Sequence, residues 1–218
     1  MRLLGADGKS DLLLSSSMSA SLAPGLLIAS PPLGDPNFER TVVLLALHGP
    51  NGGLGFVVNP VAPLKLGEVM SLAGYGDRAG ASSGAVYVGG PVEPGSGWIL
   101  CGVPDLAGGA EGLIDVTEQV KISSSRTAFD ALARDLEGDA GSARERVVFL
   151  GYSGWGPGQL EGEIAQGAWL PAPFDPAVVF EVDVEKRWEA AHALIGVSPA
   201  MGIGMRTGSS SSPAASRS

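Results

Sequence analysis

The chain has 218 residues, 44% of them hydrophobic and 17% charged, so it can bury a core without disulfide or metal staples. Its net charge of −9 disfavours nucleic acid as a partner, and its one cysteine, Cys101, excludes an internal disulfide and fits a reducing compartment. No apolar run approaches the ~18 residues of a membrane helix, so we expect a cytoplasmic protein without a membrane partner.

The two ends of the chain differ in composition from its middle. A serine-rich stretch over 15–21 follows a charged segment and predicts a disordered N-terminal extension over residues 1–23. A second serine-rich stretch predicts a disordered tail over residues 205–218. Residues 24–204 are then expected to form a single domain, and they contain no internal repeat.

Short apolar and β-branched runs predict the strands. The first two cover residues 26–29 and 41–47. Asn51-Gly52 predicts a hairpin turn that leads into a partner strand over 54–58. Gly89-Gly90-Pro91 is expected to form a turn between two later strands. The remaining expected strands cover residues 86–88, 98–101, 147–150 and 178–182.

Helical periodicity predicts four helices, over residues 64–72, 125–137, 157–167 and 185–195. In the second helix, Phe129, Leu132 and Leu136 fall on one apolar face. The last helix is expected to stop at Gly196, because glycine readily adopts the left-handed conformation that ends helices. Hairpins mixed with single helices favour an α+β fold over a regular βαβ array.

The catalytic and metal motifs that the chain approaches are incomplete. The stretch 151–155 lacks the second glycine of a nucleophile elbow, because Trp155 stands there. The glycine-rich stretch 49–55 lacks the Lys-Ser/Thr of a phosphate loop. One cysteine and two distant histidines, His48 and His192, cannot supply a zinc set, although a carboxylate site for Mg²⁺ stays open. We therefore predict no catalytic residue, no cofactor and no metal site.

One group of aromatic and polar residues stands out. Gln159 and Glu163 are four residues apart and share a helix face, and Tyr152 and Trp155 lie in the turn expected before that helix. Either such a group forms a binding pocket, or its aromatic rings fill the core while Glu163 is solvated. The spacing is compatible with both interpretations. Glycine pairs at strand ends also let a backbone or ligand come close. We predict one concave ligand or partner surface lined by Asn59, Gly89, Gly90, Tyr152, Trp155, Gln159 and Glu163.

Longer strings in the chain resemble the YqgE/AlgH family over about residues 25–197. The matching strings include Leu27-Ile28-Ala29, Arg40-Thr41-Val42-Val43, Gly151-Tyr152-Ser153-Gly154-Trp155 and Gly158-Gln159-Leu160-Glu161. The resemblance implies a cytosolic bacterial α+β protein whose branched mixed β-sheet folds into a pseudo-barrel with a few flanking helices. The chain departs from the family at Ala46, where an acidic residue is usual, and at Pro60, which replaces a basic residue after Asn59.

The resemblance implies no particular biochemical activity. Members of the family are often labelled transcriptional regulators, but this chain shows no helix-turn-helix pattern. The sequence therefore favours a non-catalytic regulatory or binding module with an unidentified protein or small-molecule partner. Two alternatives remain: a transcriptional regulator that binds DNA directly, and an enzyme that uses the segment Tyr152–Glu163.

Overall fold

The computed structural model describes residues 21–30, 40–59, 61–76, 86–102, 113–136 and 146–198. Its strands are β1 (Gly25–Ala29), β2 (Val42–Gly49), β3 (Gly52–Val57), β4 (Val86–Val88), β5 (Val92–Gly102), β6 (Leu113–Asp115), β7 (Val120–Ser123), β8 (Arg146–Trp155) and β9 (Trp169–Pro173). Its helices are α1 (Leu66–Leu72), α2 (Arg126–Asp135), α3 (Gln159–Ala165), α4 (Pro176–Phe180) and α5 (Arg187–Leu194), with a 3-10 turn over Val184–Lys186.

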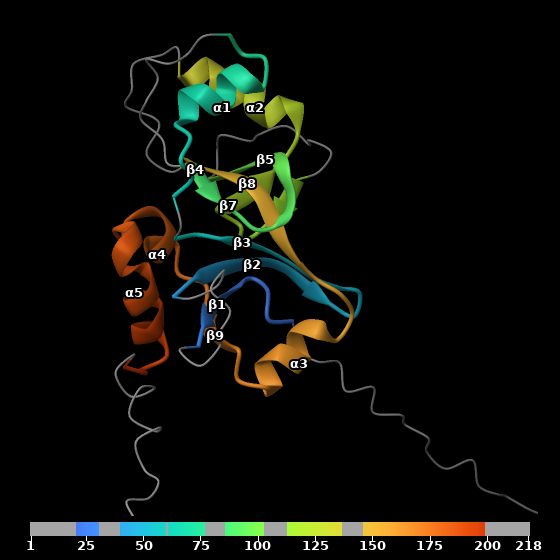
Figure 1. Ribbon diagram of the computed structural model, residues 1–218, viewed down its shortest axis with the longest axis vertical. Helices are drawn as coiled ribbons and strands as arrows, with labels where there is room; N and C mark the ends of the chain where they lie inside the picture. Colours follow the sequence, from blue (N-terminus) through green and yellow to red (C-terminus); the bar gives the residue numbers. More distant parts are fainter. Residues whose placement is uncertain are drawn as a thin grey trace, which may run out of the picture.

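The strands form one sheet in the order β6-β7-β5-β8-β3-β2-β1-β9, and β4 branches from β8. The first part of β8 pairs antiparallel with β5 and parallel with β4, whereas its last residues pair with β3. Strand β8 thereby joins the two halves of a curled sheet (Figure 1). The expected fold, an α+β protein with a branched mixed sheet and a few flanking helices, is confirmed.

Both faces of the sheet are covered, which explains the continuous apolar runs of its central strands. In β1, Leu26 and Ile28 belong to the central core cluster that includes α4 and α5, whereas Leu27 belongs to a cluster under α3. In β8, Phe149 faces the central cluster and Val148 faces a third cluster under α1 and α2. Figure 1 shows α1 and α2 at one end of the molecule and α3 at the other.

The expected helices are present with shorter bounds, but the strand expected over 178–182 is wrong. Residues 176–180 form α4, whose first turn is capped because the Asp175 side chain accepts a hydrogen bond from Ala177 N at 2.9 Å. Pro176 at the first helical position also favours a helix start. Val178 and Val179 are buried in this helix, and a buried helix accounts for an apolar run as well as a buried strand does.

Three further expectations differ from the structure. Tyr152 and Trp155 lie within β8 and not in a turn. The helix after them begins at Gln159 because Gly158 adopts a left-handed φ of 72°. The segment 89–91 does not close a hairpin between β4 and β5, since each of these strands pairs with β8. The short strands β6, β7 and β9 are additional to those expected from the sequence.

The first described residues are attached to the sheet. Ser21 Oγ donates a hydrogen bond to the carbonyl of His48 at 3.1 Å, and Leu22 N donates one to His48 Nδ1 at 3.2 Å. The expected extension over 1–23 therefore includes residues that contact β2, while its part over 1–20 and the tail over 205–218 lie outside the described residues. Among the described helices, none combines the length and apolar character needed to cross a bilayer.

Candidate binding site

Glu163 on α3 is the centre of a hydrogen-bond cluster at the end of β8. Its Oε2 accepts hydrogen bonds from Trp155 Nε1 at 2.9 Å and from Trp169 Nε1 at 2.8 Å. Its Oε1 accepts one from Gln159 Nε2 at 2.9 Å, and Gln159 Oε1 accepts one from Gly156 N at 3.0 Å. One carboxylate thus joins β8, α3 and β9. We call Trp155, Gln159, Glu163 and Trp169 the Glu163 clamp.

The clamp satisfies polar groups that the fold would otherwise bury. Both indole rings are buried and lie edge to face with centroids 6.2 Å apart, so their N–H groups need acceptors. Because a carboxylate offers about four lone-pair positions, three donors leave little capacity for a further partner. The arrangement fits a structural staple better than a free general base.

A hollow of about 450 Å³ opens beside the clamp. It brings together Trp155, Gln159 and Glu163, three of the residues that the sequence assigns to one concave surface. Its other lining residues are Pro91, Val92, Ser153, Gly154, Gln166, Ala168 and Trp169. The i,i+4 spacing on α3 was enough to place Gln159 and Glu163 together. Trp169 lies beyond the end of α3, so helical spacing does not relate it to these two residues.

Gly89 and Gly90 lie where the segment between β4 and β5 comes close to the backbone of β8. The carbonyl of Gly89 accepts hydrogen bonds from Val57 N at 2.9 Å and Ser153 Oγ at 3.3 Å. A Cβ at Gly90 would lie 2.3 Å from the carbonyl carbon and oxygen of Tyr152, so only glycine fits. Both glycines are buried, and neither lines the hollow.

Tyr152 and Asn59 also do not line the hollow. The Tyr152 ring packs edge to face against Trp98 at a centroid distance of 5.9 Å, beside the central core. Asn59 Oδ1 accepts a hydrogen bond from Val42 N at 2.8 Å and lines a separate hollow with Arg40 and Trp188. The structure therefore does not bring Asn59 to Gln159.

His48 contacts α3, which sequence reasoning did not predict. Its side chain is 2% exposed, and its Nε2 lies 3.2 Å from Glu161 Oε1. Its Nδ1 accepts the Leu22 N–H, whereas the contact of Nε2 with Glu161 lacks hydrogen-bond geometry. The tip of the β2–β3 hairpin therefore lies beside α3 without a hydrogen bond through His48.

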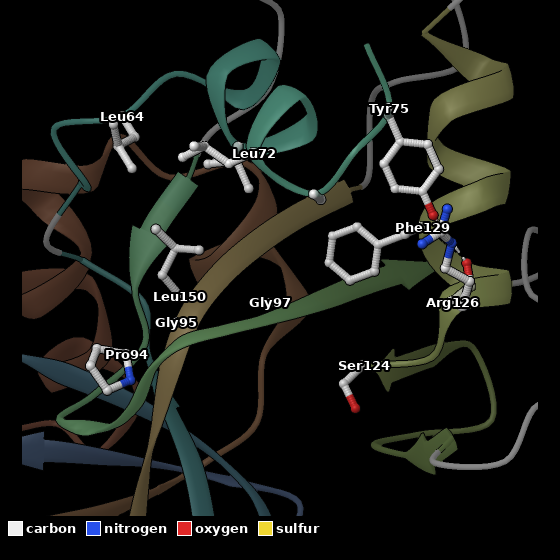
Figure 2. A pocket seen from close by; sticks show the side chains of 12 residues that line it. Leu64, Leu72, Tyr75, Pro94, Gly95, Gly97, Ser124, Arg126, Phe129 and Leu150 are labelled. Atoms are coloured by element: carbon white, nitrogen blue, oxygen red, sulfur yellow. Dashed lines mark hydrogen bonds between the residues drawn. The ribbon is translucent and has the colours of Figure 1, made fainter.

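A second cavity, also of about 450 Å³, lies at the other end of the molecule between α1, α2, β5 and β8 (Figure 2). Most of its lining is apolar, and Leu72 at the end of α1 is 78% exposed. The lining residues are Leu64, Val69, Leu72, Ala73, Tyr75, Pro94, Gly95, Gly97, Ser124, Arg126, Phe129 and Leu150. Sequence reasoning missed this cavity, because its walls come from four separate parts of the chain.

Tyr75, Arg126 and Asp130 form a polar group at one side of this apolar cavity. Tyr75 Oη donates a hydrogen bond to Asp130 Oδ1 at 2.7 Å, and the Arg126 guanidinium lies 4.9 Å from the centre of the Tyr75 ring. Burial raises the pKa of Tyr75, and the Asp130 carboxylate raises it further. The hydrogen bond from Tyr75 lowers the pKa of Asp130.

Comparisons with known proteins agree with this architecture. The sequence matches the family described as AlgH-like over residues 26–200. A UPF0301 protein of Anaeromyxobacter sp. (strain Fw109-5) is 40% identical over 186 residues, which cover 83% of this chain and 91% of the relative. A UPF0301 protein of Ruegeria pomeroyi is 42% identical over 173 residues, covering 79% and 90%. The solution structure of the AlgH protein from Pseudomonas aeruginosa superimposes with a TM-score of 0.67 at 31% identity, covering 88% of this chain and 97% of that one.

Proposed function

The chain belongs to the AlgH-like family, and from this premise we propose that it is a non-catalytic regulatory protein of the cytoplasm that binds a small apolar ligand. The proposed site is the cavity between α1, α2, β5 and β8, which we call the apolar cavity. One observation carries the proposal: this cavity of about 450 Å³ has an exposed leucine, Leu72, on its wall. Its volume falls within the ~300–1,000 Å³ usual for small-molecule sites.

The walls of the apolar cavity are anchored in the core, which supports a preformed site. In α1, Leu66 and Met70 are buried, and in α2, Leu132 is buried against the same cluster. Because protein interiors are packed to the density of organic crystals, the side of the cavity that rests on this core is rigid. An apolar ligand would fill the cavity and cover Leu72.

The groups around the apolar cavity favour binding over catalysis. Its described lining includes no histidine, cysteine or carboxylate that would serve as a base or nucleophile. The alternative enzyme site over Tyr152–Glu163 is less favoured, because Tyr152 packs against Trp98 while Glu163 is engaged by three donors. Direct DNA binding is also less favoured, since the net charge is −9.

The proposal is tested with a neutral fluorescent naphthylamine and two matched surface variants of the full chain. Leu72→Ser removes part of the apolar wall, and Leu47→Ser makes the same change at a leucine that is 48% exposed but lies outside the cavity. We expect saturable binding of the dye that weakens several-fold in Leu72→Ser and stays unchanged in Leu47→Ser. An absence of saturable binding, or equal losses in both variants, would overturn the proposal.

A further inference from the structure

Building on the proposed function, we infer that the ligand of the apolar cavity is an amphipathic carboxylate whose acid group pairs with Arg126. Arg126 is the one charged residue among the described residues that line the cavity. The other polar side chains of that lining are the hydroxyl-bearing Ser124 and Tyr75. A ligand complementary to this lining has an apolar body and a single anionic end.

The two chemical characters of the lining are separated in space. Figure 2 shows Leu64, Leu72 and Leu150 on one side of the cavity and Tyr75, Ser124 and Arg126 on the other. The Phe129 ring lies between these two groups. An extended molecule that crosses the cavity would therefore contact leucines with its tail, pass the Phe129 ring and end at Arg126.

Arg126 is oriented but keeps donors for a ligand. Its side chain is 72% exposed, and its Nε donates a long hydrogen bond to Asp130 Oδ1 at 3.4 Å. That oxygen already accepts the shorter bond from Tyr75 at 2.7 Å. Because a guanidinium has five N–H donors and an exposed ion pair is weak, a ligand carboxylate can pair with Arg126 without displacing a strong partner.

The charges near Arg126 favour a carboxylate over a phosphate ester. A phosphate ester carries about −1.5 to −2 charges, as phosphorylated side chains do, whereas a carboxylate carries one, so a carboxylate brings less negative charge next to the Arg126–Asp130 pair. Asp130 lies beside Arg126, and the whole chain carries −9, so excess negative charge on a ligand would be repelled.

The experiment compares decanoate with 1-decanol, which share an apolar chain and differ in charge, by calorimetry on the full chain. Arg126→Gln removes the proposed pairing group. Arg40→Gln is the matched control, since Arg40 is also an exposed arginine that pairs with a carboxylate, Glu189, and lies outside the described lining. We expect decanoate to bind the unmodified chain roughly tenfold more tightly than decanol, because a charge-assisted hydrogen bond distinguishes them. Arg126→Gln should remove this advantage and leave decanol binding unchanged, and Arg40→Gln should change neither.

The outcomes separate the inference from the function on which it rests. If both ligands bind equally to the unmodified chain, or if decanoate keeps its advantage in Arg126→Gln, the inference is overturned while the apolar site stands. If neither ligand binds and the neutral dye also fails, both the inference and the proposed function are overturned. A decanoate advantage that disappears in Arg126→Gln and declines with added salt supports the inference.

Discussion

The Glu163 clamp and the apolar cavity both combine aromatic rings with a charged group, but they use that group differently. At the clamp, the Glu163 carboxylate accepts three hydrogen bonds, two of them from buried indoles. At the apolar cavity, the exposed Arg126 guanidinium makes one long hydrogen bond to Asp130. The Glu163 clamp, which the sequence singles out, is therefore explained by structural hydrogen bonds. Arg126, which the sequence does not single out, keeps N–H donors that a ligand can use.

One strand contributes residues to both the Glu163 clamp and the apolar cavity. Strand β8 supplies Trp155 to the clamp at its end and Leu150 to the cavity lining nearer its middle. The two regions are covered by different helices, α3 at the clamp and α1 with α2 at the cavity. Substitutions in one region should therefore leave the other largely intact, because the helices that cover the two regions pack in different core clusters.

The largest effect on stability is expected from Glu163→Ala. This change leaves two buried indole N–H groups and the Gln159 amide without their acceptor, and each unsatisfied buried donor costs about 1–3 kcal/mol. We expect the free energy of unfolding in urea to fall by about 3 kcal/mol, with dye binding in the apolar cavity retained at low denaturant. Glu161→Ala is the control on the same helix and should cost less. A loss below about 1 kcal/mol for Glu163→Ala would contradict the staple role.

The next effect tests whether Gly90 is needed for the close approach of the segment after β4 to β8. Gly90→Ala would place a Cβ 2.3 Å from the Tyr152 backbone, and such overpacking costs about 1–3 kcal/mol. Gly95→Ala is the matched control, because a Cβ there meets nothing within 4 Å. We expect chemical denaturation to show a clear loss for Gly90→Ala and a change within about 0.5 kcal/mol for Gly95→Ala. Equal stability of the two variants would show that the fold does not need this close approach of Gly90 to β8.

A smaller effect is expected on the titration of Asp130, beside the apolar cavity, at acid pH. Because the Tyr75 hydrogen bond lowers the pKa of Asp130 in the folded chain, this carboxyl binds fewer protons there than in the unfolded chain. Its stabilising effect is present above the ordinary aspartate pKa of about 3.9 and is lost as the pH falls through the lowered value. In Tyr75→Phe, the NMR-detected pKa of Asp130 should rise toward normal. An unchanged titration would contradict the assignment of this shift to Tyr75.

We expect no specific binding of this chain to DNA. With a net charge of −9, the chain as a whole repels phosphate backbones, and cationic contacts give most of the binding energy for such backbones. A gel-shift titration at physiological salt should show no specific complex. A complex with sub-micromolar affinity and a steep salt dependence would instead favour a transcriptional regulator that binds DNA directly.

Local sequence patterns predicted the secondary structure correctly where a pattern fitted only one kind of element. The run over 41–47 indicated a buried strand and the periodicity of 125–137 a helix, and both are present as β2 and α2. The apolar run over 178–182 had two meanings, and the Asp175 cap decided for a helix. The i,i+4 spacing found Gln159 and Glu163, but no spacing could reveal that α1 and α2 flank one cavity, because tertiary packing alone brings them together.

The most direct test of ligand binding is an amide chemical-shift titration of the full chain with decanoate. If the apolar cavity is the binding site, the largest shifts should fall on residues 64–75, 94–97 and 124–129, which supply most of its lining. Residues 153–169 around the Glu163 clamp should stay nearly unperturbed. Shifts concentrated on 153–169, with α1 and α2 unaffected, would contradict the assignment and place the binding site at the clamp.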